Sequence, residues 1–574
     1  MKKIFFAILI GAVVVAGIIL GVSLGKNSDY VEKSAEATFE TRWKETLAHY
    51  INEQGITIYV DGIEQEKQIA QECYMNDDLE LMMSQDAVRE AFDCAVDFYY
   101  GNELHIDRGT YEVQVKTDAK YMHVNGKTYS VNSKLEISDK VYIPSEIISK
   151  GIGYSFNWNG EKFECQINND HPERAYLPRY YNYAEKGKIN FVGNQGEQGT
   201  CWAFAAISAL ESSILPERTR TYSKDHLIHN NGFGISIEKG GDRSMAIGYF
   251  TSWKGPVNEA DDPYDDGVSN PDLTAVDHVQ EIRLIESKDY ENIKKMILKY
   301  GAVETSVYFA LLDQYTIDSK YYNEDLYSYC YPENILPNHE IIIIGWDDDY
   351  PAENFNTGAT NNGAFICQNS WGSKFGDSGI FYVSYDDAII GTNSEVYTRV
   401  EDADNYDNIY QYDMCGYIGK IGFDKNHAFF SNVYTAKADQ YLKAVSFYAT
   451  GPNTTYKIYL DTKVEAKTNG SSSSKFHLKN VIAEGKFIDA GYYTVNLNQA
   501  YELQKGKDFA IIVEIDTPSS SHPIAIEMKT ELMPNAEVVF DGKRSYISDN
   551  GRDWEYTQKE SECNVCLKAF TDNK

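Results

Sequence analysis

Apolar residues recur at helical spacing in the segment that begins at Cys201. They are Cys201, Phe204, Ile207, Leu210 and Ile214, and the next proline in the chain is Pro216. Apolar residues three and four positions apart mark one face of a helix, and a proline ends the pattern. The pattern therefore predicts a buried helix with Cys201 in its first turn.

Two uninterrupted apolar runs follow, at 341–344 and 364–367. Short continuous apolar runs of this kind are typical of strands that are buried on both faces. His339 stands just before the first run, and Asn369 stands just after the second. Rigid strands would therefore hold both polar side chains in place.

The segments before this region predict a helix and then a strand-rich module. Residues 27–54 are polar with apolar residues at helical spacing, which predicts a stalk helix. Within 55–168, an apolar run followed by a hairpin dipeptide occurs at 59–62 and again at 123–126. A serine that can cap a short helix follows each hairpin, at Ser84 and Ser145. We expect a small α+β module built from two repeated units.

After Glu401 the helical patterns stop, and short alternating segments such as 492–497 replace them. Turn-rich breaks separate these segments, for example at 518–521. Residues 401–574 therefore predict a C-terminal β-sandwich. The fold class expected for the whole chain is multidomain α+β.

The N-terminus predicts export. Lys2 and Lys3 precede 21 residues, 4–24, that carry no charged side chain. As a helix, such a stretch spans about 30 Å, the thickness of a bilayer core. We expect residues 1–26 to be a membrane anchor that leaves the other domains outside the cell. A cleaved signal and a secreted protein are the alternative, although no clean Ala-x-Ala site follows the stretch.

Composition narrows the range of partners. The chain has 574 residues, 43% of them hydrophobic, and a formal net charge of −33. Such a length and apolar content support several folded domains. Nucleic-acid binding needs clustered Lys and Arg, so the acidic balance argues against a nucleic-acid partner.

The candidate chemistry centres on Cys201. A thiol in the first turn of a helix feels the positive end of the helix dipole, which favours the nucleophilic thiolate. His339 could exchange protons with it, and the Asn369 side-chain carbonyl could orient the imidazole while Trp371 shields that bond from water. The side-chain amide of Gln195 and the backbone N–H of Cys201 could bind an oxyanion. Taken alone, Cys201 would more often be a structural core cysteine.

These residues together resemble the papain (C1) family of cysteine peptidases. The matching segments are Gln195-Gly196, the run from Cys201 to Phe204, His339 and the run from Asn369 to Gly372, in the order of the family. His339 lies 138 positions after Cys201, which also fits the family spacing. The resemblance covers about 172–400 and implies a peptidase with one helical lobe and one β lobe, peptide substrates, and no metal or cofactor.

The resemblance also implies substrate-binding residues. Gly240-Gly241 matches the substrate-binding glycine pair of the family, and Trp371 lies in its Asn-Ser-Trp-Gly element. The residue after the catalytic histidine lines the pocket for the second substrate residue before the scissile bond, and here it is Glu340. An unpaired carboxylate on an apolar wall should recruit a cation from the substrate or hold a proton. Alternatively, the Glu340 side chain turns away to a local Lys or to solvent.

Two weaker resemblances concern the flanking modules. Residues 55–168 resemble the N-terminal domain of copper amine oxidases, although His105 and His123 lack a ligand cluster for copper. Residues 401–574 resemble the lectin-like domain that follows C1 peptidases in some clostridial surface proteins, on segments 545–548 and 550–554. Exposed aromatic side chains there could stack on cell-wall or host glycans.

Two other functions remain open at this point. A cell-surface sugar or protein binder with an inactive peptidase module is one of them, although Gln195, Cys201, His339 and Asn369 are all present. A cysteine amidase that acts on wall peptides is the other, although the Asn-Ser-Trp-Gly element is not expected in it. The nine cysteines leave eight that could pair if Cys201 stays free.

Overall fold

The computed structural model describes residues 28–310, 319–464, 476–531, 533, 535–540, 542 and 544–574. The predicted anchor at 1–26 lies outside the described residues. Among the helices that are described, none combines enough length and apolar character to cross a bilayer. The chain divides into two compact units, 1–178 and 179–574, which are described separately.

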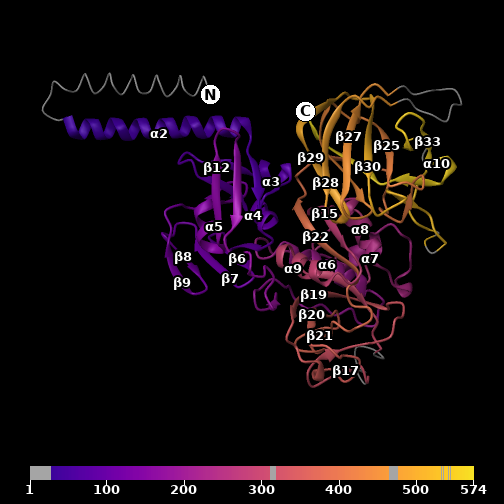
Figure 1. The fold of residues 1–574 in the computed structure, drawn as a ribbon. Helices are drawn as coiled ribbons and strands as arrows, with labels where there is room; N and C mark the ends of the chain where they lie inside the picture. Colours follow the sequence, from indigo (N-terminus) through magenta and orange to yellow (C-terminus); the bar gives the residue numbers. More distant parts are fainter. Residues whose placement is uncertain are drawn as a thin grey trace. The chain divides into compact units, whose positions relative to one another are not determined.

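The first unit begins with the predicted stalk helix, α2 (Ser28–Gln54). Ala48 and Ile51 near its C-terminal end pack into the core of this unit, so the helix is anchored at that end. Helices α3 (Lys67–Gln71), α4 (Gln85–Phe92) and α5 (Ser145–Ile152) and three small sheets complete the unit (Figure 1). The strands are β1 (Thr57–Val60), β2 (Ile63–Glu64), β3 (Cys73–Met75), β4 (Leu81–Ser84), β5 (Ala95–Tyr99), β6 (Glu103–Arg108), β7 (Tyr111–Lys116), β8 (Tyr121–Val124), β9 (Lys127–Ser130), β10 (Glu136–Ile137), β11 (Val141–Pro144), β12 (Tyr154–Asn159) and β13 (Glu164–Asn169).

The two predicted repeats are present as two hairpins and two strand–helix pairs. Both hairpin dipeptides, Asp61-Gly62 and Asn125-Gly126, have positive φ at both residues, as a tight two-residue turn requires. The strand–helix pairs β4–α4 and β11–α5 meet through antiparallel pairing of β4 with β11.

The predicted serine caps differ between the repeats. Ser84 does cap α4, because its hydroxyl accepts a hydrogen bond from the Ala87 N–H at 3.0 Å. Ser145 does not cap α5: it is the first helical residue, and Pro144 occupies the cap position. The Glu80 carboxylate instead accepts the Glu146 N–H at 2.9 Å. The carboxylate of Glu80, which belongs to the other repeat, thus takes the acceptor role that was predicted for the Ser145 hydroxyl.

The second unit contains a group of helices and a long sheet. Its helices are α6 (Cys201–Ser213), α7 (Lys224–Asn230), α8 (Arg243–Thr251), α9 (Tyr290–Lys299) and α10 (Thr557–Glu560), with short 3-10 turns at Ile237–Lys239 and Ala352–Asn354. Helix α6 begins at Cys201, as predicted, and most of its residues are buried. Six strands carry the long sheet through the first half of this unit: β15 (Asp277–Ile285), β16 (Val303–Val307), β19 (His339–Asp347), β20 (Ala364–Gln368), β21 (Ile380–Ser384) and β22 (Thr392–Asp402). Strands β17 (Tyr322–Asn323) and β18 (Ser328–Tyr329) extend its edge, and β14 (Tyr180–Asn182) pairs antiparallel with the interior strand β19.

The C-terminal half forms the predicted sandwich. Strands β28, β27, β30, β25, β32 and β33 form one sheet, and β29, β26, β35 and β23 belong to the long sheet of the second unit. A continuous apolar core that includes Val445, Phe447 and Val513 lies between them. The bounds are β23 (Asn408–Tyr410), β24 (Gly419–Ile421), β25 (His427–Thr435), β26 (Gln440–Ala449), β27 (Thr454–Asp461), β28 (Val481–Phe487), β29 (Ala490–Leu503), β30 (Asp508–Asp516), β31 (Ile524–Met528), β32 (Ser545–Ser548), β33 (Glu555–Tyr556), β34 (Cys563–Val565) and β35 (Leu567–Asn573). The expected multidomain α+β class is confirmed.

Two expectations for side chains were wrong. Tyr546 and Trp554, in the segments that suggested sugar stacking, are buried within an apolar cluster. They fill the sandwich and offer no exposed ring. The cysteines that could have paired do not: all nine are free thiols.

The long sheet joins the two halves of the second unit. Strand β15 pairs antiparallel with β22 on one side and with β29 of the sandwich on the other. Next to this junction the Trp253 ring stacks on His278 at 3.7 Å between ring centroids and contacts Phe570 at 5.3 Å. Backbone pairing and aromatic packing therefore join the two halves into one cooperative folding unit.

Trp253→Ala should lower the free energy of unfolding of the second unit. Aromatic-to-alanine changes in cores cost 3–5 kcal/mol, and because Trp253 is half-buried we expect about 2–4 kcal/mol. Denaturant unfolding should show one cooperative transition shifted to a lower midpoint. Phe191→Ala, which removes a ring that is 86% exposed, is the matched control and should change little. Two separate transitions within the second unit of the wild-type protein, one for each half, would contradict the junction as the source of cooperativity.

Candidate active site

The predicted nucleophile lies at the start of α6. Cys201 is its first residue and is half-buried. Burial raises the pKa of the Cys201 thiol, while the backbone N–H groups of Glu340, Trp202 and Cys201 itself act to lower it. The lowered pKa that the helix N-terminus predicts is therefore not what the structure gives. The loss of hydration outweighs the helix dipole at this position.

The N–H of Glu340 acts on the Cys201 sulfur, so the start of β19 lies against the start of α6. His339 is the first residue of β19 and is buried. Its Nε2 lies 2.8 Å from the side-chain oxygen of Asn369. Since an amide oxygen only accepts, Nε2 carries the hydrogen, and Nδ1 is left as the basic nitrogen of a neutral ring. Burial lowers the pKa of His339, opposed by the Asn369 bond and by Glu340.

Aromatic rings surround His339. The Trp371 ring lies 5.1 Å from the imidazole between centroids, which agrees with the predicted shielding. Phe309 stacks on the imidazole at 4.9 Å between ring centroids and contacts Trp371 at 5.4 Å. Asn338 fixes Phe309, because its side-chain oxygen accepts the Phe309 N–H at 2.7 Å and its Nδ2 donates to the Phe309 carbonyl at 3.0 Å. No sequence pattern indicated Phe309, because the strand register decides which ring faces His339.

Gln195 is held by the segment that follows Asn369. The Gln195 N–H donates to the Ser370 carbonyl at 2.8 Å, and the Ser370 hydroxyl donates to the Gln195 side-chain oxygen at 2.6 Å. The Nε2 of Gln195 donates to the Gln198 carbonyl at 2.8 Å. A primary amide carries two hydrogens, so this bond uses one of them. Ser370 thus fixes the orientation of the Gln195 amide, because its hydroxyl binds the oxygen end.

The glycine pair lies beside α6. Gly240 has φ +71° and ψ −159°, a conformation that suits only glycine. A Cβ at Gly241 would lie 2.6 Å from the Trp202 ring. Any side chain at Gly241 would therefore collide with the residue that follows Cys201. The structure brings the predicted glycine pair next to the predicted nucleophile.

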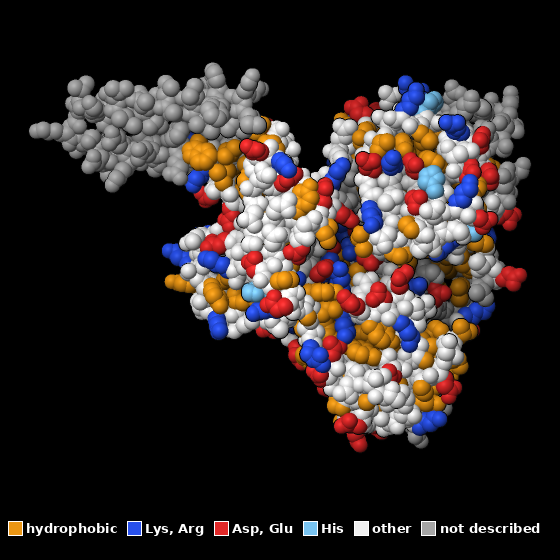
Figure 2. All heavy atoms as spheres, in the orientation of Figure 1, with side chains coloured by type: hydrophobic (Ala, Val, Ile, Leu, Met, Phe, Trp, Pro, Cys, Tyr) orange, Lys and Arg blue, Asp and Glu red, His pale blue; other side chains and the backbone are white. Residues whose placement is uncertain are grey.

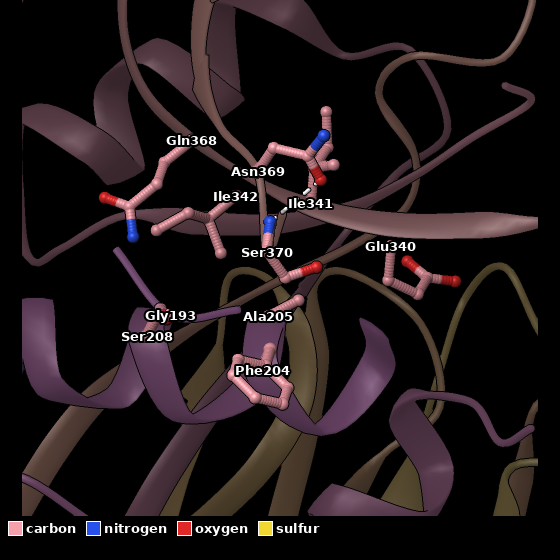
Figure 3. A pocket seen from close by; sticks show the side chains of 10 residues that line it. All are labelled: Gly193, Phe204, Ala205, Ser208, Glu340, Ile341, Ile342, Gln368, Asn369 and Ser370. Carbon is pink, nitrogen blue, oxygen red and sulfur yellow. Dashed lines mark hydrogen bonds between the residues drawn. The ribbon is translucent and has the colours of Figure 1, made fainter. Parts of the chain in front are cut away.

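A small cavity lies behind the nucleophile, between α6 and strands β19 and β20 (Figure 3). Figure 3 shows Glu340 at one end of the lining and Gln368 at the other, with Phe204 and Ala205 of α6 below them. Glu340 is half-buried, and its Oε1 accepts a hydrogen bond from the Ser306 hydroxyl at 2.7 Å, while Oε2 has no partner. The alternative in which Glu340 turns to a local Lys does not occur.

Burial raises the pKa of Glu340 to about 8. Its carboxyl therefore holds a proton over much of the neutral range, one of the two outcomes that the sequence suggested. Among the described residues, no three His, Cys, Asp or Glu side chains have the arrangement of a metal site.

Family comparisons agree with these three regions. Residues 177–400 match the family model described as papain family cysteine protease. Residues 59–167 match the copper amine oxidase N-terminal domain, and residues 409–571 match the lectin-like domain.

Solved structures and curated relatives are similar to parts of the chain. The clostridial cysteine protease Cwp84, solved after propeptide cleavage, is 27% identical with a TM-score of 0.60, over 69% of this chain and 99% of that one. The protease and lectin-like domains of Cwp84, described as a surface layer associated protein of Clostridium difficile, are 26% identical with a TM-score of 0.58, over 69% of this chain and 89% of that one. 

Among curated relatives, a viral cathepsin of Heliothis zea nuclear polyhedrosis virus is 25% identical over 43% of this chain and 63% of its own length. Cathepsin J of Mus musculus is 25% identical over 37% of this chain and 61% of its own length. The chain thus spans less than two thirds of the length of these two relatives. Residues 177–400 of this chain are a cysteine protease domain of the papain family, set between a copper amine oxidase N-terminal domain and a lectin-like domain.

Proposed function

We propose that the chain is an active endopeptidase that hydrolyses peptide bonds through a thioester acyl-enzyme. The observation that carries the proposal is the hydrogen bond from His339 Nε2 to Asn369, which leaves Nδ1 as the basic nitrogen. The next residue in the chain, Glu340, directs its N–H at the Cys201 sulfur, which supports Nδ1 as the base for Cys201. A binding protein with an inactive peptidase module would not need this arrangement of a thiol, an oriented imidazole and an amide donor. The same geometry also serves a cysteine amidase, and the substrate separates the two.

In this proposal His339 takes the proton of Cys201 as the sulfur attacks the substrate carbonyl. Burial disfavours a thiolate alone and an imidazolium alone, as the pKa shifts of both residues show. The two charges that the transfer creates are adjacent and of opposite sign, so each offsets the desolvation of the other. His339 then protonates the leaving amine, and later activates the water that hydrolyses the thioester.

Gln195 has the role of the side-chain donor to the oxyanion in this mechanism. Its remaining Nε2 hydrogen and the Cys201 N–H would stabilise the negative oxygen of the tetrahedral intermediate. Ser370 fixes the amide in advance, because its hydroxyl holds the oxygen end at 2.6 Å. A donor that is already oriented does not reorganise during the reaction.

We also propose that the chain works at the cell surface. The uncharged stretch 4–24 after Lys2 and Lys3 supports a membrane anchor. Cwp84 is a surface layer associated protein, which supports the same location by analogy. On the face shown in Figure 2, acidic and basic side chains of the described residues are interspersed, which does not favour a nucleic-acid partner. The match to a lectin-like domain supports glycan binding by residues 409–571. Tyr546 and Trp554 do not support it, because both rings are buried.

Gln195→Ala should lower kcat for peptide hydrolysis by about 10²–10³, the usual effect of removing one oxyanion donor. Cys201→Ala and His339→Ala should abolish turnover. Gln198→Ala is the matched control, because it keeps the backbone carbonyl that receives the Gln195 amide and removes only a side chain that contacts Asp265 and Tyr264. Unchanged hydrolysis in Cys201→Ala would refute the proposed mechanism.

A thiol-directed epoxide should label Cys201 selectively between pH 6 and 7. Burial raises the pKa of Cys165, Cys330 and Cys415 to about 12 and of Cys563 to about 11, and none of the four has a histidine partner in the arrangement of His339. Peptide mapping by mass spectrometry would locate the label. His339→Ala should remove it and Cys330→Ala should not. Labelling spread over several cysteines would count against the Cys–His pair.

The full-length chain should leave bacterial membranes with detergent and not with high salt, because an apolar segment and not charge attraction holds it. Val14→Arg with Val15→Arg should release it, since each central charge costs about 2.5–3.5 kcal/mol in a bilayer. Val14→Leu with Val15→Leu is the control. A mature form that starts near Lys26 in the culture medium would show instead that the segment is a cleaved signal.

A further inference from the structure

Two glutamates face each other across paired strands of the second unit. Glu304 of β16 is directly opposite Glu395 of β22, and both residues are completely buried, at 0% exposure. Side chains of opposite residues lie on the same face of a sheet, with Cβ atoms about 4.5–5.5 Å apart. The two carboxyl groups, called here the carboxyl pair, are therefore neighbours in a place that water does not reach.

The carboxyl pair has more acceptors than donors. Arg243 at the start of α8 donates from Nη1 to Oε2 of Glu395 at 3.0 Å. Both oxygens of Glu304 and Oε1 of Glu395 have no hydrogen-bond partner. A buried acceptor without a donor costs its full desolvation energy, so these three oxygens need a donor. A protonated carboxyl carries an O–H, and a proton on one glutamate can therefore serve the other.

The charges around the carboxyl pair decide where this proton lies. Two carboxylates that share a site do not both ionise readily, so the pKa of one of them rises strongly. Burial raises the pKa of Glu304 well above its usual range, and the neighbouring Glu395 raises it further. Burial raises the pKa of Glu395 only to about 7, because the Arg243 guanidinium opposes the shift. The proton therefore belongs on Glu304, and the negative charge belongs on Glu395.

Four other ionisable side chains act on the carboxyl pair: Cys201 of α6, Glu340 of β19, Asp242 beside Arg243, and Tyr397 of β22. None of the four carries a positive charge, so they cannot compensate the ionisation of both glutamates. Strands β16, β19 and β22 pack against α6, whose first residue is Cys201, and this contact is called here the active-site junction. The carboxyl pair thus lies in the layer that supports the nucleophile.

We propose that Glu304 and Glu395 share one proton as a hydrogen-bonded pair, and that this pair makes the stability of the active-site junction depend on pH. The Glu304 O–H donates to Oε1 of Glu395, and Arg243 compensates the charge of Glu395 at the other oxygen. Loss of the proton would place two carboxylates opposite each other, which destabilises the pairing of β16 with β22. The junction is therefore most stable in acid and loses stability as the pH rises. This role does not require that the chain hydrolyse peptides.

Glu304→Gln should make the second unit less sensitive to pH. The glutamine keeps an N–H donor for Glu395 and cannot ionise. In the wild type, the unfolded chain releases the Glu304 proton near its ordinary pKa of 4.5, whereas the folded chain retains it. The stabilising effect of that proton is complete below this pKa and is lost as the pH rises. Compared with Glu304→Gln, the unfolding constant of the wild type should increase about tenfold per pH unit between about pH 5 and 7.

Unfolding in denaturant at each pH can be followed through Cys367, which is completely buried in β20. A short pulse of a thiol reagent labels this cysteine only where the second unit has unfolded, and peptide mapping by mass spectrometry quantifies the label. The readout is thus specific for the second unit of the full-length chain. Glu353→Gln, the same change at an exposed position, is the control and should follow the wild type at every pH.

A second variant separates the hydrogen bond from the charge. Glu304→Met has a similar shape and offers no donor, so Oε1 of Glu395 would remain unpartnered. We expect Glu304→Met to unfold at a lower denaturant concentration than the wild type at about pH 5, where Glu304→Gln matches the wild type. The infrared difference spectrum of the wild type minus Glu304→Gln at the same pH should contain the carbonyl band of a protonated carboxyl group.

A difference in stability between the wild type and Glu304→Gln that is the same at every pH would overturn this inference. So would the lack of a protonated carboxyl band, or a Glu304→Met variant that is as stable in acid as Glu304→Gln. If Glu304→Gln fails to fold at any pH, as judged by labelling of Cys367 without denaturant, the site needs an ionised Glu304 and the shared proton is refuted.

Discussion

The pairing of residues 193–195 with residues 370–372 is the contact on which the site depends. Gln195 bonds to Ser370 through backbone and side chain, and the Gly372 N–H donates to the Gly193 carbonyl at 2.9 Å. One partner lies just ahead of α6, and the other follows β20 of the sheet. Cys201 with Gln195 comes from the first, and Asn369 with Trp371 from the second. This pairing therefore fixes the position of Cys201 and Gln195 relative to Asn369 and Trp371.

The long sheet runs without interruption through both halves of the second unit and makes that unit rigid. Strand β15 connects β22, which carries Glu395, to β29 of the C-terminal sandwich. Bonds such as that from the Arg399 side chain to the Thr494 carbonyl at 2.7 Å cross the same junction. The sandwich therefore supports the strands that frame the site, whatever else it binds. A lectin-like domain that shares a sheet with the peptidase is part of its scaffold.

Sequence alone predicted the parts of the site that lie at the ends of apolar patterns. Cys201 and His339 are the first residues of buried elements, and Asn369 directly follows one. Such positions can be located without knowing how the elements pair. Glu304, Glu395 and Phe309 stand inside or beyond strands whose register decides their neighbours. A shift of one residue in β16 would turn Glu304 to the other face, so no local pattern could reveal that Glu304 lies opposite Glu395.

The errors have a common physical origin. Ser145 matched a capping pattern, but Glu80, distant in sequence, supplied the acceptor. Tyr546 and Trp554 matched a surface pattern, but the sandwich needed their volume in its core. The helix dipole at Cys201 was identified correctly, but the neighbouring elements exclude water from the thiol, and the cost of desolvation is larger. In each case a tertiary contact outweighed a local preference, and a local sequence pattern carries no information about that contact.

Desolvation acts on the nucleophile and on the neighbouring glutamates alike. Exclusion of water from the junction of α6 with β16, β19 and β22 raises the pKa of Cys201 and of Glu304, Glu340 and Glu395. In the proposed mechanism the His339 imidazole offsets this penalty for Cys201, because it accepts the proton and stays as the counterion. For the three glutamates the protein supplies one guanidinium, that of Arg243 on Glu395, so burial favours the protonated form of the other carboxyls. The same dry junction thus makes the thiol depend on a proton acceptor and makes the glutamates retain their protons.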